Sequence, residues 1–214
     1  MIDWQQALIG LPILFLSLTV HEFAHAWAAN KLGDPTARLL GRMSLNPIVH
    51  IDLMGLVMMV ASGFRFGWAK PVPVNPANFR NWRQGMLWVS LAGPISNIIL
   101  ATGAAVLFRL LPFVGMGEQD TALAYQMVYM MIFINCALAF FNMIPLPPLD
   151  GSKVLIALLP PQYENFAISL ERYGPMVLLG VIFLGFIMPI SPIWTIIGPF
   201  VKTAVWLYTG YPLA

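Results

Sequence analysis

Long apolar runs separated by short polar or proline-rich stretches dominate this chain of 214 residues. A helix that crosses a bilayer needs about 20 mainly apolar residues. Four runs reach that length: 5–30, 86–112, 122–144 and 175–199. We expect the second to be broken early at Ala-Gly-Pro, 92–94, and the fourth to be interrupted by Pro189 and Pro192, because proline disrupts helical hydrogen bonding.

The remaining segments are shorter or more polar. Residues 51–64 are apolar but too short for a full span, and such runs are more often re-entrant, interfacial or buried. Prolines and glycines in 65–85 predict a loop. We expect 152–174, and the tail 200–214 with its tryptophan and tyrosines, to lie at the membrane interface.

These patterns predict the fold class. We expect an all-α polytopic membrane protein with a core of three transmembrane helices, a re-entrant segment and one to three further membrane helices. The whole chain, 1–214, forms one membrane-embedded domain, with its core at about 5–160 and C-terminal membrane segments at 161–214.

Composition supports a membrane location and narrows the chemistry. Hydrophobic residues make up 59% and charged residues 9% of the chain, whereas soluble domains carry about 25% charged residues. A net charge of +2 without a basic run argues against a nucleic-acid partner. The single cysteine, Cys136, excludes an internal disulfide and a cysteine-rich zinc site, and is expected in the core. The first apolar run follows no basic segment, so we read it as a retained helix.

The placement of charges predicts the orientation. If 51–64 enters the membrane and returns, 31–83 lies on one side with seven basic residues: Lys31, Arg38, Arg42, Arg65, Lys70, Arg80 and Arg83. The loop 113–120 on the other side carries Glu118 and Asp120. Basic loops stay in the cytoplasm. We therefore expect a multi-pass protein of a prokaryotic plasma membrane, with 31–83 and 145–174 in the cytoplasm.

The first apolar run contains the pattern His-Glu-Phe-Ala-His. His21 and His25 are four residues apart, so on a helix their imidazoles share one face and can hold one zinc ion. Glu22 can then take a proton from a water that the metal activates. The alternative is that all three are polar residues satisfied by neighbours. Against it, a charged group at the bilayer centre costs at least about 2.5–3.5 kcal/mol.

A catalytic zinc usually has a third protein ligand. The candidates are His50, Asp52 and Asp150. Asp150 is favoured because it follows a membrane span in a proline-rich turn, where irregular backbone is tolerated if it lines a cavity. It is equally well placed to cap a helix over 152–159.

Three motifs together resemble the site-2 protease family of intramembrane zinc metalloproteases. They are HEFAH at 21–25, AGPISN at 92–97 and NMIPLPPLDG at 142–151, and the resemblance covers about 5–160. It implies one Zn²⁺ per chain held by His21, His25 and Asp150, with Glu22 as the general base. It further implies that Asn142 donates a hydrogen bond to the developing oxyanion; the alternative is that Asn142 caps a helix end.

The resemblance also implies substrate contacts. Gly93 and Asn97 match a Gly-x-x-x-Asn pattern that the family places near the substrate, although close helix packing explains both equally well. Residues 51–83 would hold an extended peptide by strand addition. No stretch is polar enough for a PDZ or CBS domain, so the chain resembles a minimal catalytic core.

We therefore expect an intramembrane zinc endopeptidase that cuts transmembrane segments of membrane-protein substrates within the lipid bilayer. Intramembrane ionisable groups also mark ion pathways. A metal-ion or proton transporter, and a non-catalytic binder of transmembrane segments, are the alternatives.

Overall fold

The computed structural model describes residues 4–63, 66–115 and 117–212. Arg65, one of the basic residues in the orientation argument, lies outside them. The described α-helices are α1 (Trp4–Lys31), α2 (Thr36–Leu39), α3 (Leu53–Ala61), α4 (Trp82–Leu110), α5 (Glu118–Asn142), α6 (Asp150–Leu158), α7 (Glu164–Ile187) and α8 (Pro192–Thr209). Short 3-10 turns occur at Pro47–His50, Pro76–Asn78, Leu111–Phe113 and Pro161–Tyr163.

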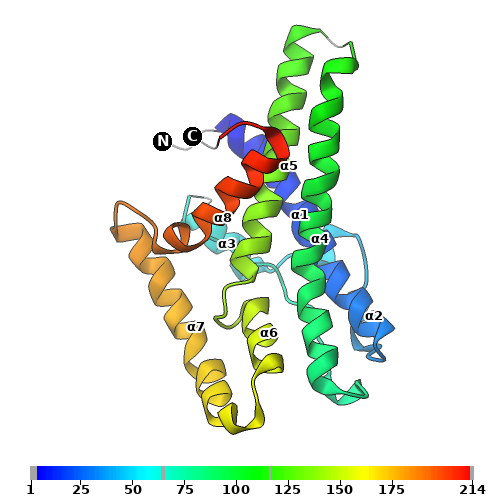
Figure 1. Ribbon diagram of the computed structural model, residues 1–214, viewed down its shortest axis with the longest axis vertical. Coiled ribbons are helices and arrows are strands. Elements are labelled where there is room, and N and C mark those ends of the chain that lie inside the picture. Colours follow the sequence, from blue (N-terminus) through cyan, green and yellow to red (C-terminus); the bar gives the residue numbers. More distant parts are fainter. Residues whose placement is uncertain (1–3, 64–65, 116, 213–214) are drawn as a thin grey trace.

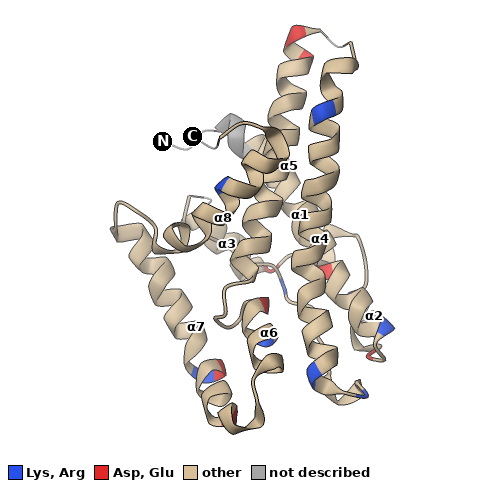
Figure 2. Cartoon of the chain, in the orientation of Figure 1, with Lys and Arg blue, Asp and Glu red and all other residues tan. Residues whose placement is uncertain are grey.

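Four helical stretches are long and apolar enough to cross a membrane: Leu8–Lys31, Trp82–Phe113, Glu118–Asn142 and Pro161–Ile187. Charged side chains gather toward the ends of α4 and α5, and the long middle parts of both helices carry none (Figure 2). This distribution suits a bilayer, whose hydrocarbon core excludes unpaired charge. The predicted all-α polytopic fold is confirmed.

Helices α1, α4 and α5 form the central bundle. α4 and α5 are an antiparallel hairpin, and α1 packs against both (Figure 1). Alanines at 101, 104 and 105 of α4 are buried in the main apolar core, together with Cys136 of α5 and Val201 of α8. Small side chains let membrane helices approach closely, which is how these helices associate without a hydrophobic driving force. The predicted core position of Cys136 is confirmed.

α4 passes through the expected break without interruption. The helix begins at Trp82, where the Asn81 side chain accepts a hydrogen bond from the backbone N–H of Gln84, and it includes Pro94. Proline forfeits one backbone hydrogen bond, a loss that neighbouring helices make tolerable inside a bundle. The predicted break at 92–94 is therefore wrong.

The C-terminal part also differs from the prediction. The predicted span 175–199 is wrong: α7 begins at Glu164, includes Pro175 and ends at Ile187. The predicted interfacial stretch 152–174 is divided between α6 and the first turns of α7. Residues 188–191, with Pro189, separate α7 from α8, where the Ser191 hydroxyl accepts from the Trp194 N–H. α7 continues through Pro175 and ends two residues before Pro189, and Pro192 occupies the first turn of α8, where a missing N–H costs least.

The segment around α3 is a short helix whose two flanks meet, and its entry into the membrane stays a prediction. Nine residues of helix rise only about 13 Å, too little to cross a bilayer. Ile51 and Ala69 pair in an isolated antiparallel bridge, and the Lys70 N–H donates to the His50 carbonyl at 2.8 Å. The two ends of the segment therefore meet. Residues 66–75, which we call the strap, then run without helix, and the Val72 N–H in this stretch contacts Glu22 of α1.

Candidate metal centre

The two histidines of the His-Glu-Phe-Ala-His pattern lie on one face of α1, directed into the bundle. Only 3% of His21 and 7% of His25 is exposed. Their Nε2 atoms are 3.0 Å apart. One turn of helix separates the two residues, so the local backbone alone brings these atoms together. The predicted pair of imidazoles is thus aimed at a single point.

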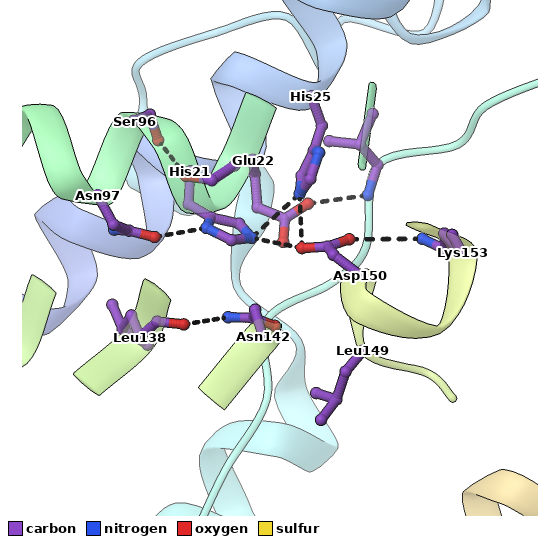
Figure 3. A network of polar contacts seen from close by, with 12 residues as sticks. His21, Glu22, His25, Ser96, Asn97, Leu138, Asn142, Leu149, Asp150 and Lys153 are labelled. Atoms are coloured by element: carbon purple, nitrogen blue, oxygen red, sulfur yellow. Dashed lines mark hydrogen bonds and ion pairs between the residues drawn. The ribbon is translucent and has the colours of Figure 1, made fainter. Parts of the chain in front are cut away.

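Asp150 brings a third potential ligand atom from α6. Its Oδ2 lies 3.1 Å from Nε2 of both His21 and His25 (Figure 3). The cap position of α6 is Leu149, and no side chain caps this helix end. The Asp150 carboxylate therefore does not cap α6, which was the alternative role. Lys153, one turn later, places Nζ 3.7 Å from Oδ1.

The other two candidate ligands have different partners. The Asp52 carboxylate accepts from the Gly55 N–H at 2.9 Å and so caps α3. His50 is buried, and its Nε2 donates to the Ser44 carbonyl at 2.8 Å. In the described part of the chain, the group of metal-binding side chains consists of His21, His25 and Asp150.

The donor chemistry of this group fits a zinc ion. Nδ1 of His21 donates to Asn97 Oδ1 at 2.6 Å, and Nδ1 of His25 donates to the Val89 carbonyl at 2.7 Å. With Nδ1 engaged in each ring, both Nε2 atoms face the Asp150 carboxylate and are available as ligand atoms. Two imidazole nitrogens and a carboxylate oxygen converging on one point are a donor set that zinc prefers. Tetrahedral zinc with bonds of about 2.0–2.1 Å separates its ligand atoms by about 3.3–3.5 Å, slightly more than the 3.0–3.1 Å here.

Gly93 of α4 lies directly against both imidazoles. A Cβ added at this position would lie 2.6 Å from His21 Nε2 and would also collide with His25. Asn97, one turn later, is fully buried and holds His21. Both residues thus lie behind the metal ligands, and their contact with substrate stays a prediction.

Glu22 lies beside the three ligands, on the side of Asp150 and His25 (Figure 3). Its Oε2 accepts a hydrogen bond of 3.0 Å from the backbone N–H of Val72, in the strap. The carboxylate is half-buried and lines the same cavity as the metal ligands. This position suits a base that acts on a water at the metal.

Two buried charged groups hold the strap, one near its middle and one at its C-terminal end. The Asp34 carboxylate accepts from the Asn75 N–H and from Asn78 Nδ2, both at 2.7 Å, and Arg42 donates to the Lys70 carbonyl at 2.6 Å. Burial acts to raise the pKa of Asp34, but hydrogen bonds from Thr36, Asn75 and Asn78 outweigh it and hold that pKa below its ordinary value. Asp34 therefore stays ionised. Because Asp34 and Arg42 bond the strap on either side of Val72, they help to keep Val72 in contact with Glu22.

Asn142 is the last residue of α5. Its Nδ2 donates to the Leu138 carbonyl at 3.0 Å, one turn back in the same helix. The side chain also lines the cavity that contains the metal ligands. Its hydrogen bond to an oxyanion stays a prediction.

A cavity of about 1350 Å³ connects the metal ligands with the space in front of α7. The residues that line it come mainly from α1, α3, the strap and α4 to α8, and most are apolar. Among the described helices, α7 packs mainly on α8 and stands apart from the central bundle (Figure 1). The metal centre is thus reached through a mostly apolar space between helices.

Five residues in contact with this site were not predicted from the sequence. They are Ser17, Val72, Val89, Asn135 and Lys153. The contact of Asn135 could have been predicted, because a polar side chain within an apolar span needs a partner. The contact of Val72 could not, since it involves only the backbone N–H.

Comparisons with known proteins place these contacts in context. The model of the peptidase family M50 matches residues 113–181. YwhC of Bacillus subtilis (strain 168), provisionally named a zinc metalloprotease, is 42% identical over 169 residues, 78% of this chain and 76% of its own length. Rip2 of Mycolicibacterium smegmatis (strain ATCC 700084 / mc(2)155), named in the same provisional way, is 26% identical over 77% of this chain and 62% of its own. The zinc metalloprotease MJ0392 of Methanocaldococcus jannaschii is 25% identical over 71% of this chain and 34% of its own. No solved structure matches.

Proposed function

Because the chain belongs to peptidase family M50, the site-2 proteases, we propose that it cuts peptide bonds within or near transmembrane segments of membrane proteins. The family identifies an integral membrane zinc metalloprotease, and intramembrane proteolysis is its general kind of activity. The observation that carries the proposal is the triangle of His21 Nε2, His25 Nε2 and Asp150 Oδ2 with Glu22 beside it.

In this proposal His21, His25 and Asp150 hold the zinc ion. Zinc in such a three-ligand site lowers the pKa of water to about 7 and polarises a carbonyl. Glu22 takes the proton of the attacking water and delivers it to the leaving amine. The Val72 N–H holds Oε2 of this carboxylate, which keeps the base oriented toward the ligands.

Asn142 is the proposed donor to the oxyanion. One hydrogen of its amide is bonded to Leu138, the amide nitrogen carries a second, and the side chain lines the cavity. A preorganised donor to the developing charge contributes about 2.7–4 kcal/mol to the transition state. Asn142→Ala should therefore lower the cleavage rate and leave zinc binding intact.

The substrate is proposed to reach the metal through the apolar cavity beside α7. A transmembrane segment has an apolar surface that matches this lining. The strap supplies irregular backbone along the same cavity, where an unwound stretch of substrate can pair by strand addition. The basic residues around α2 and the start of α4 support an orientation with the site open to the cytoplasm.

The test is Glu22→Gln, compared with the parent and with Glu118→Gln, which changes an exposed glutamate at the start of α5. Zinc content and cleavage of a transmembrane peptide are measured in detergent. We expect Glu22→Gln to retain zinc and to lose about 10²–10⁴-fold in cleavage, the usual contribution of a general base. Unchanged cleavage would remove Glu22 from this role, and a parent without zinc would overturn the proposed function.

A second test addresses the substrate. Cleavage of a model transmembrane peptide is compared with and without glycine or proline at the scissile region. We expect the helix-breaking residues to increase cleavage, since a helical peptide bond is shielded by its own hydrogen bonds. Equal cleavage of both peptides would contradict unwinding.

A further inference from the structure

A chain of buried polar side chains lies behind His21, on the side away from the cavity. Ser17 of α1, Asn97 of α4 and Asn135 of α5 are each fully buried. They come from the three helices of the central bundle, in the apolar part of each. Polar groups at this depth have no water to bond, so their partners must come from the protein.

The hydrogen bonds among these residues run in one direction. Nδ2 of Asn135 donates to Ser17 Oγ and to the Met131 carbonyl, both at 2.9 Å. Nδ2 of Asn97 donates to Asn135 Oδ1 at 2.9 Å and reaches the Ser17 carbonyl at 3.4 Å. Oδ1 of Asn97 accepts from His21 Nδ1 at 2.6 Å.

The direction of this chain is fixed by its first contact. The Met131 carbonyl only accepts, so the amide nitrogen of Asn135 must face it and the amide oxygen must face Asn97. Asn97 then turns its own nitrogen to Asn135 and its oxygen to His21. The proton of His21 is consequently held on Nδ1, and the lone pair of Nε2 points at His25 and Asp150.

The two histidines are therefore oriented by different means. His25 Nδ1 donates to a backbone carbonyl, that of Val89, which no side-chain substitution removes. His21 depends on two asparagine side chains and a serine. Groups that bond the second nitrogen of a ligand histidine fix its tautomer and ring orientation, and removing them typically weakens metal binding by about 10–100-fold.

We propose that Ser17, Asn135 and Asn97 form an amide relay that positions His21 for zinc, with Asn135 as its central positioning residue. This rests on the proposed metal centre of His21, His25 and Asp150. The rival role for Asn135 and Asn97 is to join helices by polar contacts, which stabilises the bundle without acting on the metal.

The first experiment measures zinc affinity by chelator competition, and the absorption spectrum of the cobalt-substituted protein, for the parent and Asn135→Leu. The control is Thr102→Val, which removes the hydrogen bond of 2.9 Å between α4 Thr102 and α8 Tyr208. We expect Asn135→Leu to bind zinc roughly 10–100-fold more weakly and to alter the cobalt spectrum. Thr102→Val should match the parent in both.

A double substitution separates positioning from helix packing. In the relay, Asn135 acts on His21 only through Asn97. Once Asn97→Ala has removed that link, adding Asn135→Leu should leave zinc affinity unchanged. Independent packing roles predict that the two losses add instead, and additive losses would overturn the relay.

Ser17→Ala is a milder test of the same relay, which remains available if Asn135→Leu does not fold. It removes one of the two acceptors of the Asn135 amide and leaves the Met131 carbonyl in place. We expect zinc affinity to fall roughly two- to tenfold, the usual effect of one hydrogen bond. Parental zinc affinity in Ser17→Ala, or in a folded Asn135→Leu, would overturn the relay; a parent that binds no zinc would instead overturn the proposed function.

Discussion

The active-site helix α1 is held in two different ways on its two sides. Toward the bundle, neutral groups orient the histidines: the Asn97 amide bonds His21, and the Val89 carbonyl bonds His25. Toward the strap, ionised groups act on Glu22 indirectly. Asp34 and Arg42 bond the strap, and the Val72 N–H of the strap bonds Glu22.

The difference follows from depth and from the available partners. An ionised group within the apolar bundle is costly, whereas an amide that finds partners there is tolerated. Asp34 lies beyond the end of α1, among backbone and side-chain donors that satisfy its charge. The arrangement separates two tasks. Changes on the bundle side should act on zinc binding, and changes on the strap side should act on cleavage while zinc is retained.

The largest effect is expected when a metal ligand itself is removed. Asp150→Ala should weaken zinc binding by more than about 100-fold, beyond the range for residues that only support a ligand, and cleavage should disappear with the zinc. Metal analysis after dialysis and a cleavage assay measure both. Asp120→Ala, at the exposed start of α5, is the control. Zinc bound at the parental level would remove Asp150 from the ligand set.

A smaller loss on the bundle side is expected from Gly93→Ala. The new Cβ meets both imidazoles and must displace them, so zinc affinity should fall roughly 10–100-fold. Gly103→Ala in the same helix is matched to it, since a Cβ there has open space. Alanine is the better helix former, and neither variant should lose helix by circular dichroism. Equal zinc affinities of the two variants would contradict the close packing of Gly93 on the ligands.

The strap side should respond differently to Asp34→Asn. The substitution puts an amide nitrogen where Oδ2 or Oδ1 accepts hydrogen bonds, which costs about 1.5–3 kcal/mol for a charged contact. We expect faster hydrogen exchange across 70–75 and roughly tenfold slower cleavage, with parental zinc affinity. Asp120→Asn is the control. Loss of zinc with unchanged exchange of the strap would show that the two sides are not separate.

The smallest effect is a pH dependence from the same carboxylate. The folded pKa of Asp34 is lowered, so its contribution to stability is present above the ordinary value of about 3.9 and is lost as pH falls through the folded pKa. The difference in Tm between the parent and Asp34→Asn should therefore be constant near neutrality and shrink below about pH 4. A constant difference down to pH 2 would contradict the lowered pKa.

Much of the fold was predictable from local patterns. Apolar run length located the first three spans, and the short run at 51–64 correctly indicated a helix too short to cross a bilayer. The errors came from proline. Pro94 and Pro175 lie within continuous helices. Pro94 is buried in the central bundle, where neighbouring helices can compensate for the lost hydrogen bond, and a local pattern does not show such packing.

The sequence by itself determined the pair His21 and His25 with Glu22 between them, because helical periodicity fixes which side chains share a face. Only the tertiary structure selected Asp150 over His50 and Asp52, since its carboxylate reaches His21 across 129 residues of chain. The same is true of Asn135, whose amide acts on His21 through a third helix, and of Val72, which contributes a backbone N–H. Contacts between distant segments depend on how helices pack, and no local spacing encodes that.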